Sequence, residues 1–273
     1  MTAKSKVGCY PFLAEPFHCD LTGRLFIGHL GNHLLNAADF HSNDRGFGMN
    51  YLNPIHKTWV LSRLAIEMEE LPAMYTRFQV ETWVENAMRF FTQRNFKIMG
   101  MAGTSGLSDV DSQTAPSGEE APKVYGYGRS VWAMIDTDTR QPADLLAIHD
   151  GAIMDYVEVD KPCPILKSSR VKMSEGAQRV RTIDTFYSDV DINGHINSVK
   201  YIEHILDLWE AEWHRVHAVH RFEIAYVAES HQGDRLTFYR EQTGENEFCV
   251  RITKTESASD VENEVVRSKV CFF

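Results

Sequence analysis

The chain repeats one order of predicted elements, and this repeat constrains its fold more than any other feature. Residues 28–40 carry apolar side chains at three- and four-residue spacing, which predicts a helix, and strand-like runs follow it. A second helical pattern begins after Gly194, again followed by strand-like runs. We interpret the pattern as an internal duplication with a period of roughly 160 residues. Several consecutive strands after one helix predict an antiparallel sheet packed on that helix, an α+β arrangement.

The predicted strands have regularly spaced apolar side chains and are bounded by turn residues. They cover residues 59–83 in two runs around Leu71-Pro72, then 90–99 and 125–135, and in the second half 179–186, 222–228, 235–242, 247–255 and 264–273. Residues 9–25 are interpreted as short extended pieces broken by prolines. Residues 101–123 are rich in Gly, Ser, Pro and acids, so a solvated hairpin loop is expected there. Residues 137–178 suit a connection between halves, and we place the domains at 1–157 and 158–273.

The composition is that of a globular protein. Of 273 residues, 43% are hydrophobic and 24% are charged, so the chain can bury a substantial core. Its net charge of −10 argues against broad binding to nucleic acid or membrane surfaces. Five cysteines without a C-x-x-C pair argue against a disulfide framework and indicate a reducing compartment. No apolar run is long enough to span a bilayer and no signal-peptide pattern begins the chain, so we expect a cytoplasmic protein.

One polar stretch precedes the second predicted helix. Residues 188–200 read SDVDINGHINSVK, and in an extended segment Asp191, Asn193 and His195 would point to one side. Asn193 or Asn197 can cap the helix that follows, whose free N–H groups could stabilise an oxyanion. The apolar face of that helix comprises Val199, Ile202, Leu206, Trp209 and Trp213. The alternative interpretation is an ordinary turn with helix caps.

A comparison of the two halves and the position of one acid narrow the choice of catalytic residues. Counting back from the glycine-histidine pairs, Leu25 and Ile27 stand in the first half where the second half has Asp191 and Asn193. One site per chain is therefore expected, in the second half, and His29 is interpreted as structural. Glu229 ends an apolar strand directly after the second helix, which makes it a candidate acid; the alternative is a solvent-exposed strand end.

The histidine patterns give little support for a metal. His29 and His33 have the spacing of an H-E-x-x-H zinc helix, but Leu30 stands at the position of the glutamate. His214, His217 and His220 are explained more simply by favourable interaction with a helix C-terminus. G-x-S-x-G and Walker motifs do not occur. We therefore expect no metal and no cofactor.

The stretch 188–207, SDVDINGHINSVKYIEHILD, resembles the signature SD-x-D-x-N-x-H-x-N-x-x-KY of acyl-acyl-carrier-protein (acyl-ACP) thioesterases. The resemblance extends to FTQRNFKI at 91–98, GRSVWAMIDTDTRQP at 128–142 and the strand that ends in Glu229. It implies a tandem hot-dog fold, in which each half is a long helix wrapped by an antiparallel sheet. It also implies a first half, 1–157, that holds the acyl chain and is catalytically degenerate, and a second half, 158–273, that carries the linker and the catalytic residues.

By that resemblance, the catalytic set is Asp191, Asn193, His195 and Glu229. Some family members have a cysteine after the glutamate, whereas Ser230 stands here, so the cysteine is expected to be dispensable. The side chains expected to line the acyl-chain tunnel are Phe40, Met49 and Trp59. Without a plastid-type leader, the likeness is to bacterial members.

The resemblance implies hydrolysis of fatty acyl-ACP to free fatty acid and carrier thiol in fatty acid biosynthesis. Glu229 would activate water with help from His195, Asp191 would orient the imidazole or the water, and Asn193 would orient the thioester. The carrier is acidic, so docking needs a local basic patch, for which Lys167, Arg170 and Lys172 in the basic run from Lys161 to Arg181 are candidates; a solvated linker is the alternative.

Three other functions use the same fold. An acyl-CoA thioesterase would share the chemistry but lack a carrier partner. A non-enzymatic acyl-binding hot-dog module would bind without hydrolysis, and a dehydratase or hydratase would use a different acid and base. The sequence leaves a homodimer, the chain length and the saturation of the acyl group open.

Overall fold

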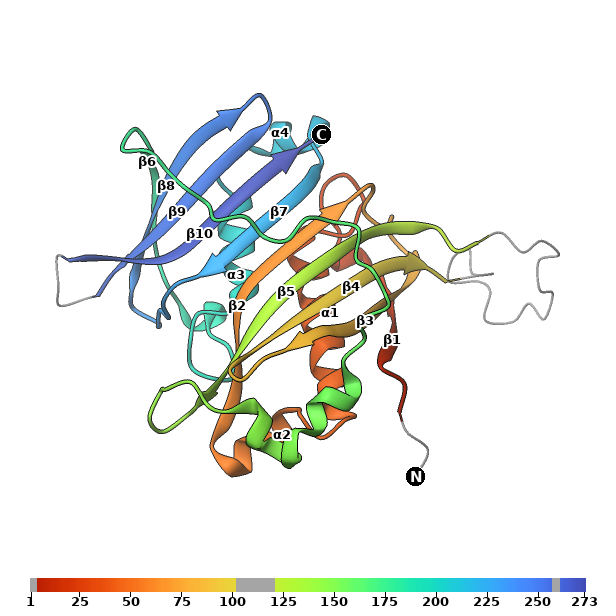
Figure 1. Ribbon diagram of the computed structural model, residues 1–273. Helices are drawn as coiled ribbons and strands as arrows, with labels where there is room; N and C mark the ends of the chain where they lie inside the picture. Colours follow the sequence, from red (N-terminus) through yellow and green to blue (C-terminus); the bar gives the residue numbers. More distant parts are fainter. Residues whose placement is uncertain (1–3, 102–120, 257–260) are drawn as a thin grey trace. The chain divides into compact units, whose positions relative to one another are not determined.

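The computed structural model describes residues 4–101, 121–256 and 261–273 and divides the chain into two compact units. Unit 1 comprises Met1–Leu61 and Glu67–Leu166, and unit 2 comprises Ser62–Ile66 and Lys167–Phe273. Each unit contains an antiparallel sheet with a helix, as the duplication predicted (Figure 1). The expected hairpin loop at 101–123 lies almost entirely outside the described residues.

Unit 1 is built on the long helix α1. Its elements are β1 (Val7–Leu13), η1 (Pro16–His18), α1 (Ile27–Asn43), α2 (Met49–Leu52), η2 (Asn53–Ile55), both ends of β2 (Lys57–Met68), β3 (Arg77–Ala87), β4 (Phe91–Gly100), β5 (Val124–Asp136) and η4 (Leu145–Tyr156); the middle of β2, Ser62–Ile66, belongs to unit 2. The strand order is β1-β3-β4-β5-β2, and α1 lies behind the sheet in Figure 1. Leu30 and Leu34 of α1 are fully buried, as are Phe78 and Val80 of β3. The helical spacing and the strand alternation of the sequence therefore both produce core faces.

The opposite face of β3 is covered at one point. The alternation placed Trp83 on the face of Gln79 and Glu81, yet the Trp83 side chain is fully buried. The segment after η4 covers it, because Cys163 and Ile165 pack on the indole and the Trp83 Nε1–H donates to the Lys161 carbonyl over 3.1 Å. The connection between halves is therefore part of the packing of unit 1 at this point.

Unit 2 repeats the arrangement with a shorter helix. Its elements are β6 (Gln178–Asp184), η5 (Tyr187–Asp189), α3 (Ser198–Leu206), α4 (Ala211–Val216), β7 (Val219–Tyr226), β8 (Arg235–Gly244), β9 (Glu247–Thr255) and β10 (Glu262–Phe272), with the strand order β7-β10-β9-β8-β6. All adjacent pairs in this order are antiparallel.

The predicted second helix is broken in two. It was expected to continue to Trp213, but α3 ends at Leu206 and α4 starts at Ala211. The apolar face survives the break, because the rings of Trp209 and Trp213 both pack edge-on against Phe248, with centroids 5.0 and 6.0 Å away. Packing on the sheet, and not helix continuity, therefore holds these two indoles.

A buried imidazole on α1 should make folding sensitive to acid. His41 is 1% exposed, and its Nε2 lies 3.0 Å from the Lys6 carbonyl. Burial, reinforced by Arg94 and Arg45, lowers the pKa of His41 to about 2. An unfolded histidine has a pKa of about 6.5, so below that pH the unfolded chain binds a proton that the folded chain excludes. Stability should therefore fall as the pH drops below about 6.5, towards 2.

The effect can be measured as the free energy of unfolding in denaturant between pH 7 and pH 5. We expect His41→Gln to have a shallower dependence on pH than the wild type, even if it is less stable at pH 7. His56→Gln is the control, because the His56 side chain is 63% exposed. Equal slopes for the wild type and His41→Gln would contradict the assignment.

No helix in the described part of the chain is both long enough and apolar enough to cross a membrane.

Candidate active site

The polar stretch before α3 is a tight turn. The amide of Gly194 donates to the Asp191 carbonyl over 3.0 Å, and the Asp191 amide donates to the His195 carbonyl over 2.8 Å. The Asp191 carboxylate accepts from the amides of Asn193 and His195, at 2.8 and 3.3 Å. The expectation of an extended segment was therefore wrong: Gly194 closes a turn in which the Asp191 carboxylate holds the backbone amides of Asn193 and His195.

Gly194 has φ +81°, a conformation that side-chain-bearing residues rarely adopt, and a Cβ there would meet nothing within 4 Å. We expect Gly194→Ala to cost about 1–2 kcal/mol of stability through backbone strain alone. Because the strain acts on the turn that holds His195, turnover should also fall.

Gly23 in unit 1 provides a matched control. It has φ +73° and equally open surroundings, so Gly23→Ala should cost a similar free energy of unfolding. It should leave turnover unchanged at a temperature where both variants are folded. Equal turnover for the two variants would show that the Gly194 turn does not position the reaction.

His195, in the turn before α3, is in contact with Glu229, in the loop after β7. The His195 Nε2 lies 3.3 Å from the Glu229 Oε2, and the two side chains are 24% and 36% exposed, respectively. The ring of His231 packs edge-on against that of His195, with centroids 5.0 Å apart. The imidazole and the carboxylate are thus in contact while both remain within reach of solvent, as a pair that activates water requires.

The loop that carries Glu229 is held by residues that the sequence analysis did not single out. The His231 amide donates to the Asp234 carboxylate over 2.8 Å, and the Thr185 hydroxyl donates to the His231 and Asp234 carbonyls over 2.9 and 2.7 Å. Asp234 and Thr185 are both buried. The sequence Gln232-Gly233-Asp234 is typical of a turn, which is a signal for Asp234, but nothing in the sequence points to its partner Thr185.

Ser230 is turned into the protein. Its side chain is 1% exposed, and its hydroxyl is hydrogen-bonded to that of Tyr201 on α3. Burial raises the pKa of Tyr201 to about 12, so the phenol is neutral at physiological pH. The Ile196 amide also donates to the Ser230 carbonyl, over 2.8 Å. Ser230 therefore ties the Glu229 loop to α3 and is not presented as a nucleophile.

Asn197, and not Asn193, caps α3. The Asn197 side chain accepts from the Val199 amide over 3.0 Å, and the Tyr226 hydroxyl donates to the Ser198 carbonyl over 2.8 Å. Asn193 lies at the exposed outer corner of the turn. Of the four predicted residues, the structure joins Asp191 to His195 through the backbone and His195 to Glu229 through side chains, and it leaves Asn193 at the edge.

The two halves contain the same turn, but it aligns their sequences differently from the comparison made on the sequence alone. In unit 1 the Gly23 amide donates to the Asp20 carbonyl over 3.0 Å, as Gly194 does to Asp191. The Asp20 carboxylate accepts from the Thr22 amide over 2.8 Å, as Asp191 does from Asn193. Gly23 therefore matches Gly194, and the earlier pairing of the two glycine-histidine dipeptides is wrong.

Backbone hydrogen bonds extend this alignment of the two halves to the position of Glu229. The Leu25 amide donates to the Pro72 carbonyl over 2.8 Å, as the Ile196 amide does to the Ser230 carbonyl. Pro72 therefore matches Ser230, and the residue before it, Leu71, matches Glu229. The first-half counterparts of Asp191, Asn193, His195 and Glu229 are thus Asp20, Thr22, Arg24 and Leu71. The first half keeps the acid of the turn but lacks the imidazole and the second carboxylate.

The predicted tunnel residues lie in different surroundings within unit 1. The Phe40 ring packs on Tyr10, with centroids 5.7 Å apart, and Met49 is 39% exposed. Trp59 packs against the apolar cluster around Phe47 and donates to the Phe47 carbonyl over 2.8 Å. Next to this cluster lies a cavity of about 520 Å³. Its lining includes Tyr51, Ile55, Ala143, Ile148 and His149, and none of the three predicted residues.

The basic run is partly neutralised. Lys161 pairs with Glu81 over 3.0 Å, and Arg181 lies 3.7 Å from Asp207. Lys167, Arg170 and Lys172 are exposed. Residues 167–172 therefore present three exposed basic side chains.

Comparison with known proteins gives one consistent result. Family models for the N-terminal and C-terminal domains of acyl-ACP thioesterases match residues 12–112 and 173–269. A crystal structure of an acyl-ACP thioesterase from Bacteroides thetaiotaomicron is 50% identical, with a TM-score of 0.83 over 98% of both chains. The 12:0-ACP thioesterase from Umbellularia californica shares the fold, with a TM-score of 0.78 at 15% identity over 100% of this chain and 99% of that one.

Curated plant proteins are more distant. The oleoyl-acyl carrier protein thioesterase 2 of Arabidopsis thaliana is 24% identical over 91% of this chain, and the palmitoyl-acyl carrier protein thioesterase of Gossypium hirsutum is 26% identical over 86%. The matches span 66% and 52% of those two proteins, so the chain matches about half to two thirds of their length.

Proposed function

Because this chain belongs to the acyl-ACP thioesterase family, we propose that it hydrolyses fatty acyl-ACP to free fatty acid and carrier thiol. The observation that carries the proposal is the 3.3 Å approach of the His195 Nε2 to the Glu229 Oε2. The turn before α3 brings this imidazole and this carboxylate together, whereas Arg24 and Leu71 occupy the corresponding places at the matching turn of unit 1.

The proposed reaction needs an activated water more than an acid. A thiol has a pKa of about 8.5, so a thiolate leaves without prior protonation. Glu229 accepts the proton of the attacking water, and His195 shares it through their contact. Asp191 holds the His195 backbone through the turn, so its role is positioning. The exposed amide of Asn193 is proposed to orient the thioester from the rim.

The carrier would dock on the exposed charges at 167–172. Carrier proteins are acidic, and this chain is itself acidic at −10, so a local basic surface must offset repulsion. We expect the double variant Arg170→Glu, Lys172→Glu to raise KM for acyl-ACP about tenfold or more at low salt, and kcat to change little. KM for acyl-CoA of the same chain length should not rise. An unchanged KM for acyl-ACP would remove the patch from docking.

Measuring thiol release from acyl-ACP substrates of increasing chain length, beside acyl-CoA of each length, tests the function. We expect equimolar fatty acid and thiol, with higher kcat/KM on the carrier. Preference for acyl-CoA would favour the rival thioesterase. Binding without thiol release would favour a non-enzymatic module, and turnover of an enoyl or 3-hydroxyacyl thioester without hydrolysis would favour a hydratase. We also propose a cytoplasmic location, as the sequence indicated.

A further inference from the structure

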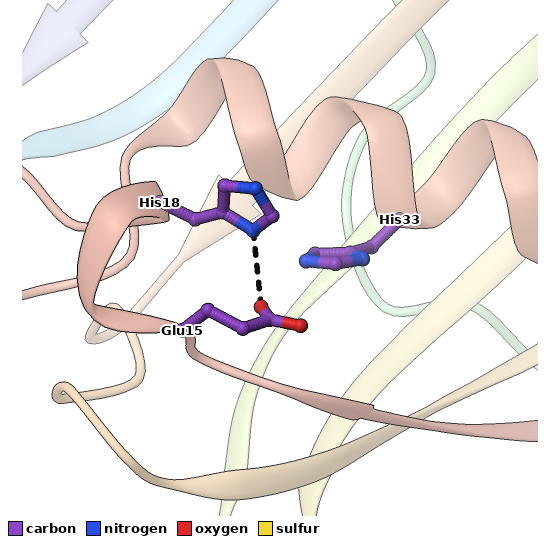
Figure 2. A group of neighbouring side chains, drawn as sticks. All are labelled: Glu15, His18 and His33. Carbon is purple, nitrogen blue, oxygen red and sulfur yellow. Dashed lines mark hydrogen bonds and ion pairs between the residues drawn. The ribbon is translucent and has the colours of Figure 1, made fainter.

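Two imidazoles and a carboxylate gather in unit 1, where no residue of the proposed hydrolytic site lies. Glu15 and His18 lie at the two ends of the segment that carries η1, and His33 projects from α1 (Figure 2). One ligand atom from each residue lies within 4.8 Å of the others. The His18 Nδ1 is 3.0 Å from the Glu15 Oε2, and the His33 ring lies beside the same carboxylate without a hydrogen bond to it (Figure 2).

His33 is the fixed member of the cluster. Its side chain is 8% exposed and packs on the rings of Phe12 and Phe78, with centroids 4.6 and 5.5 Å away. Its buried Nε2 has no hydrogen-bond partner among the described residues, which is uncommon for a buried polar atom. An imidazole nitrogen held at a fixed place without a partner is available to coordinate a metal.

The corresponding position of the second half holds one acid beside one imidazole. The Phe26 amide, at the N-cap of α1, donates to the His18 backbone carbonyl over 2.9 Å. The Asn197 amide, at the N-cap of α3, likewise donates to the Asp189 backbone carbonyl over 2.8 Å. His18 therefore matches Asp189, and by the same register His33 matches His204. The His204 Nε2 lies 3.5 Å from the Asp189 carboxylate. Unit 1 thus replaces an acid–imidazole pair by two imidazoles, with Glu15 added.

We propose that Glu15, His18 and His33 bind a divalent transition metal ion, of which Zn²⁺ fits the donor set best. Two imidazole nitrogens and one carboxylate oxygen are a common three-ligand zinc set, and solvent would supply the fourth ligand. Ligand atoms around tetrahedral zinc are about 3.4 Å apart, given bonds of about 2.1 Å. The side chains of Glu15 and His18 are 41% and 40% exposed, so they can rotate towards His33.

The ion would link the η1 segment to α1. His29, which the i, i+4 spacing suggested as the partner of His33, instead stacks on the His18 ring with centroids 4.3 Å apart and supports its orientation. In the proposed site the second imidazole comes from the η1 segment and not from the i, i+4 position on α1.

Cobalt titration of the chelator-treated full chain tests the site. Tetrahedral Co²⁺ absorbs strongly in the visible, so we expect one saturable equivalent per chain that Zn²⁺ displaces. His18→Gln and His33→Gln should each weaken Co²⁺ binding by at least about tenfold, because each removes one of three protein ligands. His56→Gln, which removes an exposed imidazole paired with Asp138, should bind as the wild type does.

A second readout guards against misfolding of His33→Gln. Zn²⁺ should raise the thermal unfolding midpoint of the wild type and of His56→Gln, but not that of His18→Gln or Glu15→Gln, which alter half-exposed side chains. Binding of Co²⁺ that is absent, or that is the same in the wild type, His18→Gln and Glu15→Gln, would overturn the proposal.

Discussion

Replacing Glu229 by Gln, or His195 by Ala, should lower kcat/KM for acyl-ACP hydrolysis by about 10²–10⁴-fold, the usual contribution of a positioned general base. Glu229→Gln keeps the shape of the side chain but removes the charge that accepts a proton from water. His195→Ala removes the imidazole that contacts this carboxylate at 3.3 Å. The loss should appear in kcat more than in KM, since neither change removes contacts to the acyl chain.

A matched control keeps this result interpretable. Glu69 is an exposed acid just after β2, as Glu229 is an acid just after β7, but it has no imidazole counterpart because Arg24 takes the place of His195. Glu69→Gln should therefore retain full turnover. The unfolding midpoints of all three variants should stay near that of the wild type. Full turnover by Glu229→Gln would remove Glu229 from the role of base.

Trp83→Ala should lower the free energy of unfolding by about 3–5 kcal/mol, the usual cost of truncating a buried tryptophan. The Trp83 side chain is fully buried between the outer face of β3 and the segment containing Cys163 and Ile165. Truncation leaves a cavity and also removes the donor to the Lys161 carbonyl. The change can be measured by denaturant unfolding followed by circular dichroism.

Trp132 on β5 is the matched comparison. Its side chain is only partly buried, and its Nε1–H donates locally to the Ser130 hydroxyl over 2.8 Å. Trp132→Ala should therefore cost clearly less than Trp83→Ala. If the two variants lost equal stability, the segment at 161–165 would not be packed on β3 as described.

Most of the fold could be predicted because the spacing of apolar residues follows the buried face of each helix and strand. The strand predicted at 247–255 coincides with β9, and the helix predicted at 28–40 lies within α1. β1 (Val7–Leu13) was predicted only in part, as extended pieces from residue 9, because Pro11 interrupts its pattern. Pro11 is tolerated because β1 stands at the end of the strand order, where a missing amide donor costs little.

The residues of the site could be predicted from the sequence, but the conformation of the backbone that carries them could not. Alternating polar residues fit an extended strand, but Gly194 at positive φ allows a tight turn instead, and periodicity cannot separate these two conformations. The contact of His195 with Glu229 joins positions that no local pattern connects. The strand position made Glu229 a candidate acid, and the family resemblance grouped it with His195. The duplicated register was likewise hidden, because it is carried by the backbone hydrogen bonds of Gly23 and Gly194 and not by similar side chains.

The most direct test of the account is a double-mutant cycle on His195 and Glu229, measured as kcat/KM for thiol release from a long-chain acyl-ACP. If the two residues activate one water as a unit, the double variant His195→Ala, Glu229→Gln should lose no more activity than the worse of the two single variants. Losses that multiply in the double variant would show that the two groups act independently, and would contradict the central claim.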